Sequence, residues 1–292
     1  MTPRSTSART AFGPMVIAAA EQYTPAAQRL FRDELAVRFL PLGPRLAARA
    51  CRWRFVRTLL MRATEDLAPG MWGGVICRKR YADDKVVEAV GAGIGQVVIL
   101  GAGLDTRAYR LVAPAGGRAY ELDQPANTAV KAERLQAVLG SRADQVRVIP
   151  VDFQTDDVGT ALAENGFDIG EPALFVWEAV TQYLTEDAVR TTLAFLSRAA
   201  RQSRLIFTYV RKDFLDGTNL YGAARLHRRM TGKYDVWHFG LAPHEVGALL
   251  LDYGWAEREQ VGSAEYTARY LEPVGRDLEV SELERFVHAE RV

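Results

Sequence analysis

The clearest chemical signal in the sequence is a glycine-containing turn directly after an apolar run. The residues read Val97-Val-Ile-Leu-Gly-Ala-Gly-Leu-Asp105, so that Gly101 and Gly103 come just past the run. Glycines at such a turn let the backbone approach a ligand closely and present amide groups to it. The third glycine of the dinucleotide-binding fingerprint would fall at position 106, which is Thr106, and this disfavours a pyrophosphate site.

Carboxylates end the next two apolar runs. Asp123 closes Tyr120-Glu-Leu-Asp123, with Glu121 two residues before it, at the place where an acid can accept hydrogen bonds from both hydroxyls of a ribose. Asp152 and Phe153 follow the third run, where an acid can bind the amine of an adenine and a ring can cover the base. Together with the glycine turn, these residues indicate an adenosine ligand without a pyrophosphate. The alternative is that they are ordinary acids capping helices.

Short apolar runs separated by helical stretches must position these side chains. Five runs of Val, Ile, Leu and Phe predict buried parallel strands: Val97–Leu100, Arg118–Leu122, Val146–Val151, Ala173–Trp177 and Arg204–Val210. Helical periodicity in Gln124–Leu139 and Glu186–Ala200 predicts crossover helices, so the expected fold class is α/β with a doubly wound sheet. Two further segments, Trp255–Val261 and Thr267–Leu271, predict an antiparallel pair at the sheet edge.

The chain is expected to divide into an N-terminal helical cap, residues 1–90, and a ligand-binding domain, residues 91–292, with an insertion at about 212–244 after the fifth strand. Residues 1–80 carry 14 basic and five acidic groups, against 23 and 31 in the remainder. We interpret the basic segment as a helical face that is solvated or packed between domains, the alternative being a patch for an acidic partner. The apolar stretch Phe12 to Ala20 follows Arg4 and Arg9 and has a weak similarity to a secretory signal. We interpret it instead as part of an amphipathic helix that continues to Phe31.

Composition excludes several classes of protein. The 292 residues are 48% hydrophobic and 25% charged, as in an ordinary globular chain, and the net charge of +1 provides no global field for a nucleic acid or a membrane. No apolar run reaches the roughly 18–20 residues of a membrane span. The two cysteines, Cys51 and Cys77, form no metal-binding pair, so we expect a cytoplasmic protein without a metal site.

The sequence resembles the leucine carboxyl methyltransferase family of S-adenosylmethionine-dependent enzymes. The resemblance is carried by four motifs: Leu100-Gly-Ala-Gly-Leu-Asp-Thr-Arg-Ala-Tyr-Arg-Leu111, Tyr120-Glu-Leu-Asp-Gln-Pro125, Val151-Asp-Phe153 and Trp177-Glu-Ala-Val-Thr-Gln-Tyr-Leu184. It extends upstream to Cys77-Arg-Lys-Arg-Tyr-Ala-Asp-Asp84 and downstream to Phe239-Gly-Leu-Ala-Pro-His-Glu245. It implies the Rossmann-like seven-stranded sheet of class I methyltransferases. Family members act on protein phosphatases, on tRNA and, in bacteria, in polyketide pathways.

The resemblance implies a role for each matching residue toward S-adenosylmethionine and its product, S-adenosylhomocysteine. On the adenosine side, Asp123 matches the acid that binds the ribose, with Glu121 as its neighbour. Asp152 and Phe153 match the pair at the adenine. All four follow or end predicted strands.

On the methionine side, Arg78 matches an arginine that contacts the carboxylate of the cofactor, a task suited to a guanidinium. Gly101 and Gly103 are expected to line the methionine moiety. Glu178 matches a glutamate near the amino group and the reaction centre, and Tyr183 a tyrosine that faces the acceptor.

Two positions depart from the family pattern. Ala179 stands after Glu178 where a glycine is common, which alters the wall of the acceptor pocket. Lys79 stands after Arg78 where a threonine is common.

The expected activity is O-methylation of a carboxylate or hydroxyl on a small molecule or peptide. A carboxylate is already ionised at neutral pH and needs only a group to orient it, for which Arg110 and Tyr183 are candidates. A phenol would be helped by a base, and the candidates are His227, His238 and His244, each of which is more typically a surface or packing residue.

Other functions stay open at this point. One is a nicotinamide-dependent oxidoreductase, which Thr106 disfavours, and another is a non-catalytic protein that binds S-adenosylmethionine. A nucleic-acid partner rests only on the basic N-terminal segment and is not expected. The sequence predicts neither the acceptor nor the oligomeric state.

Overall fold

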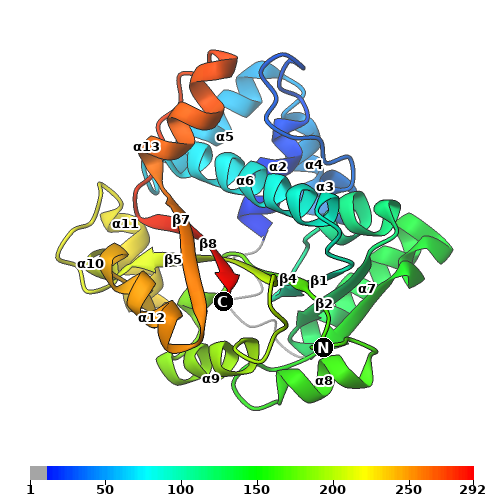
Figure 1. Cartoon of the computed structure of the whole chain (residues 1–292). Coiled ribbons are helices and arrows are strands. Elements are labelled where there is room, and N and C mark those ends of the chain that lie inside the picture. The colour runs from blue at the N-terminus through cyan, green and yellow to red at the C-terminus, as the bar shows by residue number, and fades with distance from the viewer. Residues whose placement is uncertain (1–11) are drawn as a thin grey trace.

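The protein is built on one mixed sheet, seen near the centre of Figure 1 in a computed structural model that describes residues 12–292. The sheet order is β3-β2-β1-β4-β5-β8-β7, and a two-residue strand, β6, adds to β5. Its strands are β1 (Gln96–Leu100), β2 (Arg118–Asp123), β3 (Val146–Pro150), β4 (Ala173–Trp177), β5 (Arg204–Arg211), β6 (Gly240–Leu241), β7 (Trp255–Val261) and β8 (Glu284–Arg291).

The first five strands are parallel, and β8 runs antiparallel to both β5 and β7. The predicted α/β sheet and its five central strands are therefore confirmed, and β6 makes the strand count eight instead of seven. Strands β1 to β3 are added toward one edge of the sheet, and β4 and β5 are added on the other side of β1. The strand order therefore reverses between β1 and β4, and ligands of such sheets bind at this switch point.

Helices cover both faces of the sheet. They are α2 (Phe12–Glu21), α3 (Ala36–Phe39), α4 (Leu42–Ala50), α5 (Arg54–Glu65), α6 (Met71–Gly91), α7 (Pro125–Leu139), α8 (Val158–Glu164), α9 (Glu186–Leu196), α10 (Lys212–Leu215), α11 (Ala224–His227), α12 (Val246–Asp252) and α13 (Ser263–Tyr266). As drawn in Figure 1, α2, α6 and α13 lie above the sheet, and α8, α9 and α12 lie below it.

Strand β1 shows how the sequence divides the core between these layers. Its residues are all buried, and they alternate between faces as a strand requires. Val97 and Ile99 pack with the N-terminal helices, whereas Val98 and Leu100 pack with α8, α9 and α12. A strand covered on both faces reads as a continuous apolar run, which is why these strands were predictable.

The inserted segment at about 212–244 forms a small core of its own. Phe214, Leu226 and Trp237 are buried there, together with Ala68 before α6 and Leu283 before β8. The segment is therefore packed against the start of α6, and its end at Val236 and His238 reaches the cavity described below.

Two sequence predictions are wrong in detail. Thr267–Leu271 is a helical turn that continues α13 instead of a strand, and β7 pairs with β8. The reason is a helical pattern of burial, since Tyr266 and Tyr270 lie four residues apart and stack on each other at 6.3 Å between ring centroids.

The helix predicted to run to Phe31 ends at Glu21. The chain turns there ahead of Pro25, whose ring removes a backbone donor and restricts the residue before it, although Leu30 and Phe31 are still buried. The faint secretory-signal pattern includes Arg4 and Arg9, which lie outside the described residues.

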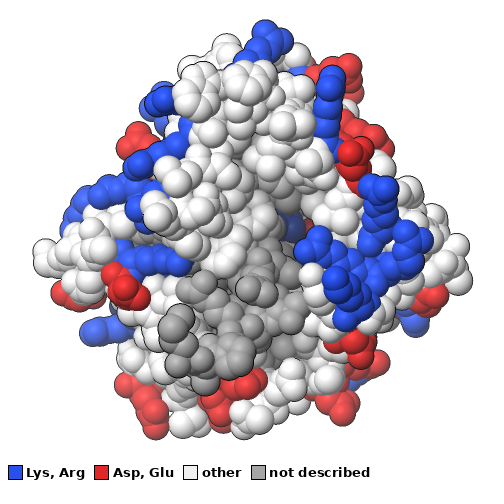
Figure 2. Space-filling view, turned by 180° about the vertical axis from the view of Figure 1, so that it is seen from behind, with Lys and Arg blue, Asp and Glu red and all other residues white. Residues whose placement is uncertain are grey.

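The basic N-terminal helices α4 and α5 leave apolar side chains in solvent. Phe55 is 73% and Leu59 66% exposed, and no residue of α5 is buried. Seen from behind, the upper part of the molecule presents a broad uncharged area with basic side chains at its sides (Figure 2). Apolar side chains in this part of the segment are therefore exposed to solvent. Among residues 12–292, no helix is long and apolar enough to cross a bilayer.

Candidate functional site

The ends of the parallel strands converge on a cavity of about 330 Å³. It lies at the switch point between β1 and β4, and α2 and α6 contribute to its walls. Seen from behind, the molecular surface is hollowed near its middle, and basic side chains lie beside the hollow (Figure 2). Eight of the ten residues predicted for the site line the cavity: Arg78, Gly101, Gly103, Asp123, Asp152, Phe153, Glu178 and Tyr183.

The glycine turn and Asp123 form one hydrogen-bonded unit. Gly101 and Gly103 have φ angles of 70° and 44°, in the left-handed region that glycine adopts without strain. The amide of Gly103 donates to Asp123 Oδ2 at 2.5 Å, and Gln124 N and Asn127 Nδ2 donate to Oδ1 at 2.7 Å each. The carboxylate is thereby fixed at the end of β2 and facing the turn.

Asp152 and Phe153 lie together just beyond β3. Asp152 accepts a hydrogen bond from the amide of Gln154 at 3.0 Å, and its own amide donates to Asp156 at 2.9 Å. Phe153 is buried against the core of the lower layer and still forms part of the cavity wall. The structure thus brings this pair to the same cavity as Asp123.

Glu178 follows β4 and is held between two arginines. Its Oε1 accepts a hydrogen bond from Arg78 Nε at 2.8 Å, and its Oε2 lies 2.6 Å from Arg107 Nη1. Burial raises the pKa of Glu178, but Arg107, Lys79 and Arg78 lower it by more, so that the net pKa is well below its usual range. Glu178 is therefore a carboxylate at neutral pH.

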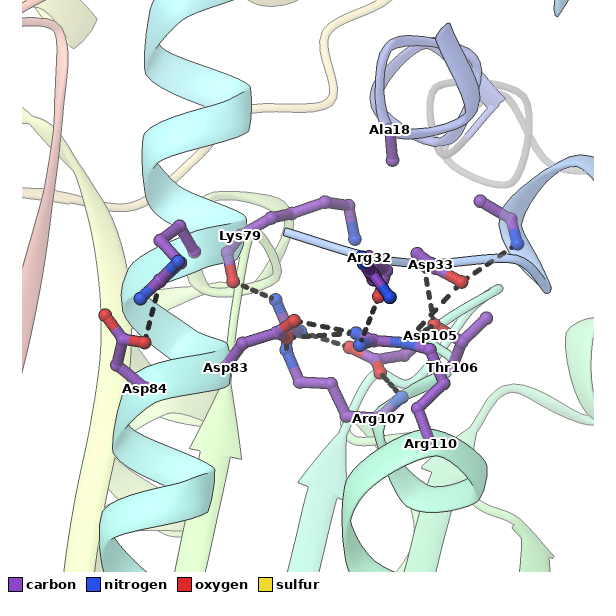
Figure 3. Close-up of polar contacts among 12 residues, drawn as sticks. Ala18, Arg32, Asp33, Lys79, Asp83, Asp84, Asp105, Thr106, Arg107 and Arg110 are labelled. Carbon is purple, nitrogen blue, oxygen red and sulfur yellow. Dashed lines mark hydrogen bonds and ion pairs between the residues drawn. The ribbon is translucent and has the colours of Figure 1, made fainter. Parts of the chain in front are cut away.

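Arg107 is the centre of the charged cluster drawn in Figure 3. Its side chain is 1% exposed and forms ion pairs with Asp83, Asp105 and Glu178. Its Nη2 also donates to the carbonyl of Lys79 at 3.2 Å. Sequence reasoning did not assign a role to Arg107, Asp83 or Asp105. All three stand within the quoted motifs, but no spacing indicates that residues 83 and 107 meet.

Arg110 takes part in the same network but does not line the cavity. Its Nη2 lies 2.9 Å from Asp83 Oδ2, and its Nε donates to Thr106 Oγ1 at 2.9 Å. Thr106 in turn donates to Asp33 Oδ2 at 2.7 Å (Figure 3). Arg110 and Thr106 therefore tie the segment before α3 to the turn after β1, and we assign Arg110 no contact with an acceptor.

Glu121 is the second predicted residue that the structure places away from the cavity. Its side chain is buried under α7, where its Oε2 lies 2.7 Å from Lys131 Nζ and accepts a hydrogen bond from Tyr109. Burial raises its pKa to about 7, although Lys131 opposes the shift. Glu121 lies two residues deeper in β2 than Asp123, so the helix above it covers it.

Aromatic and apolar side chains also line the cavity. Tyr183 is half-buried there, and its ring meets that of Trp237 edge to face at 6.3 Å between centroids. Val236 and His238 from the insertion and Met15 from α2 line the cavity as well, and we call these three residues and Tyr183 the acceptor wall. Among the three histidines considered as bases, His238 lines the cavity, whereas His227 donates from Nε2 to the carbonyl of Leu215 and His244 lies on the surface.

Ala179 has a φ of 58°, in the region that favours glycine. Its amide donates to Thr208 Oγ1 at 2.7 Å, and this bond holds the turn between Glu178 and the acceptor wall. The chain therefore keeps a glycine-like backbone at the position where it departs from the family pattern.

Comparisons with known proteins agree with this geometry. A family model described as leucine carboxyl methyltransferase matches residues 11–197. A Mycobacterium avium protein is 32% identical over 211 aligned residues, with a coverage of 67% of each chain. A second protein from that species is 39% identical over 185 aligned residues, with a coverage of 61% of this chain and 59% of its own. Both are described as candidate S-adenosyl-L-methionine-dependent methyltransferases.

Two solved structures share the fold. A protein of the DUF574 family from Streptomyces avermitilis covers 99% of this chain and 98% of its own, with a TM-score of 0.60 and 13% identity. A candidate methyltransferase from Thermobifida fusca covers 82% of this chain and 89% of its own, with a TM-score of 0.57 and 19% identity. The predicted fold class and the predicted cofactor class are confirmed, and the chain belongs to the leucine carboxyl methyltransferase family.

Proposed function

We propose that the protein transfers a methyl group from S-adenosylmethionine to a carboxylate oxygen of a small molecule or peptide. The observation that carries the proposal is the strand-end cavity itself. It gathers the glycine turn with Asp123, the aromatic ring of Phe153 and the buried carboxylate of Glu178 around one space. In this proposal Asp123 and Phe153 bind the adenosine, the glycine turn lies along the methionine moiety, and Glu178 faces the amino group of the cofactor.

The residues present fit the cofactor chemically. Asp123 offers carboxylate oxygens to ribose hydroxyls at the cavity edge, and Phe153 offers an apolar face to a base. Glu178 Oε2 is a buried oxygen that forms no hydrogen bond with the described residues, although it is close to Arg107. The ion pair with Arg107 leaves a lone pair of Oε2 unused, and the amino group of the cofactor would donate a hydrogen bond to it.

When bound, S-adenosylmethionine supplies a methyl group on a positively charged sulfur, which transfers in line to a nucleophile. The protein contributes by positioning and by electrostatics. Arg107 and Arg78 hold Glu178 in place as a carboxylate, so that its oxygens keep a fixed position at the cavity. Met15 and Val236 contribute apolar side chains to the lining of the cavity.

A carboxylate acceptor agrees with the acceptor wall because it needs orientation and no base. The hydroxyl of Tyr183 is the group we assign to this task, since Tyr183 lines the cavity and its ring is packed against Trp237. A hydroxyl acceptor is the second candidate. It is favoured by one observation, that the exposed His238 lines the cavity and has the chemistry of a general base.

The experiment is methyl transfer from methyl-labelled S-adenosylmethionine to a panel of matched acids and phenols. Mild base hydrolyses a methyl ester and releases labelled methanol, whereas a methyl ether is stable. We expect base-labile product that forms equally well with the His238→Asn variant and at a rate that does not rise with pH. Base-stable product that is lost in His238→Asn would establish the hydroxyl candidate instead. Binding of S-adenosylhomocysteine without transfer to any acceptor would favour a non-catalytic role.

A further inference from the structure

Lys79 is a cation at the cavity that the site described so far does not use. It lies on α6 directly after Arg78, and it lines the cavity beside the glycine turn, Asp105 and Glu178. In Figure 3 its side chain leaves α6 and ends in an ammonium group that no dashed contact reaches. Across the described part of the chain, residues 12–292, this ammonium group forms no ion pair and no side-chain hydrogen bond.

Arg78, in contrast, is already committed. Its Nε donates to Glu178 at 2.8 Å and its Nη1 contacts Glu284 Oε2, so that one guanidinium serves two carboxylates. The side chain is buried, and a third carboxylate there would compete with both. Arg107 likewise forms ion pairs with three carboxylates, those of Asp83, Asp105 and Glu178. Arg134, which also lines the cavity, lies on α7 and donates to the carbonyl of Phe39.

The charge of Lys79 acts on the same corner of the cavity. Burial raises the pKa of Asp105, and Arg107 and Lys79 then lower it to a value below its usual range. Lys79 likewise contributes to the lowered pKa of Glu178. An ammonium on a flexible four-carbon stem, close to the glycine turn and without an ion pair to any of residues 12–292, suits an anion that arrives with a ligand.

We propose that Lys79 binds the carboxylate at the amino-acid end of the cofactor, while Arg78 acts on Glu178 and positions it. The assignment rests on the proposed function, because it presupposes that the cavity takes S-adenosylmethionine. It replaces the expectation from the family pattern that Arg78 alone receives this carboxylate. The departure from the common threonine at position 79 thereby gains a chemical reason.

The test compares S-adenosylmethionine with its decarboxylated analogue, which lacks only the carboxylate. Calorimetric titration of the wild type is expected to show a preference for the carboxylated ligand of roughly 10–100-fold, the range of a charge-assisted hydrogen bond. In Lys79→Met this preference falls to near unity, mainly through weaker binding of S-adenosylmethionine. Lys79→Arg retains most of it.

Two controls separate this role from a general effect. Lys85→Met lies on the same helix and removes a lysine that pairs with Glu88 and Glu259, so it should leave the preference unchanged. Arg78→Met is expected to weaken both ligands by a similar factor, because Glu178 loses its support. Circular dichroism checks that each variant is folded.

The outcomes are distinct. A preference that persists in Lys79→Met but disappears in Arg78→Met would overturn the assignment and return the carboxylate to Arg78. Failure of the wild type to bind S-adenosylmethionine, its analogue or S-adenosylhomocysteine would contradict the proposed function, and the role of Lys79 with it.

Discussion

The buried cluster around Arg107 makes a prediction that is large enough to measure without knowledge of the acceptor. Replacing Arg107 by methionine keeps an apolar stem of similar length but removes the guanidinium. Asp83, Asp105 and Glu178 are then left buried with too few cations. Removing one partner of a buried ion pair costs about 3–5 kcal/mol. For 292 residues this corresponds to a decrease in Tm of about 5–8 °C.

The pH dependence of this loss follows from the pKa shifts. Burial raises the pKa of Asp105 and Glu178, but nearby cations, Arg107 first among them, bring both below their usual values. Their contribution to wild-type stability is therefore present above the unfolded pKa and is lost as the pH falls through the folded one. In Arg107→Met the main cation that lowers these two pKa values is missing, so burial raises the pKa of Asp105 and Glu178. The free energy of unfolding of the variant therefore falls as the pH rises. The difference between the two proteins should be larger at about pH 8 than at about pH 5.

Urea unfolding of the wild type and Arg107→Met across this pH range is the assay. The matched control is Arg118→Met, which removes an exposed arginine paired with Glu171 and should change the free energy of unfolding by about 1 kcal/mol or less. A loss in Arg107→Met no greater than that in Arg118→Met, or one that does not change with pH, would refute the reasoning about the cluster.

Three further predictions concern single residues. Ala179→Gly relieves a left-handed backbone and should raise the free energy of unfolding by about 1 kcal/mol, whereas the same change at Ala194 in α9 should lower it, both measured by urea unfolding. Burial raises the folded pKa of Glu121 to about 7, so ionisation of this carboxyl opposes folding and the free energy of unfolding falls between about pH 4.5 and 7. Glu121→Gln should make this fall smaller. An unchanged pH dependence of the free energy of unfolding in urea titrations would contradict this. Tyr183→Phe should raise the KM for the acceptor and leave the affinity for S-adenosylhomocysteine unchanged, and steady-state kinetics with calorimetry would expose the opposite pattern.

The sequence indicated the sheet and most of the cavity because both depend on local patterns. Strands such as Ala173–Trp177 are apolar throughout, and groups such as Gly101, Asp123 and Glu178 come directly after strands, whose ends must meet at one edge. The family resemblance added Arg78 and Tyr183, which no local pattern identifies.

What the sequence did not indicate depends on which elements pack together. Glu121 has the same chemistry as Asp123 and shares its face of the strand, and only the docking of α7 with Lys131 separates their roles. Arg110 faces Asp83 because α6 lies across the turn after β1. The strand β8 begins and ends in charged residues, which obscured its buried centre and allowed Thr267–Leu271 to look like the better partner for β7.

The central claim is that Asp123, fixed by the amide of Gly103, binds the ribose at the adenosine end of a cofactor site. Calorimetric titration with S-adenosylhomocysteine, with NAD as a control ligand, tests it most directly when the wild type is compared with Asp123→Ala. The account predicts micromolar binding of S-adenosylhomocysteine to the wild type, none of NAD, and a loss of roughly 30-fold or more in the variant, since two ribose hydroxyls lose a charged acceptor. Undiminished affinity in a folded Asp123→Ala protein would contradict it.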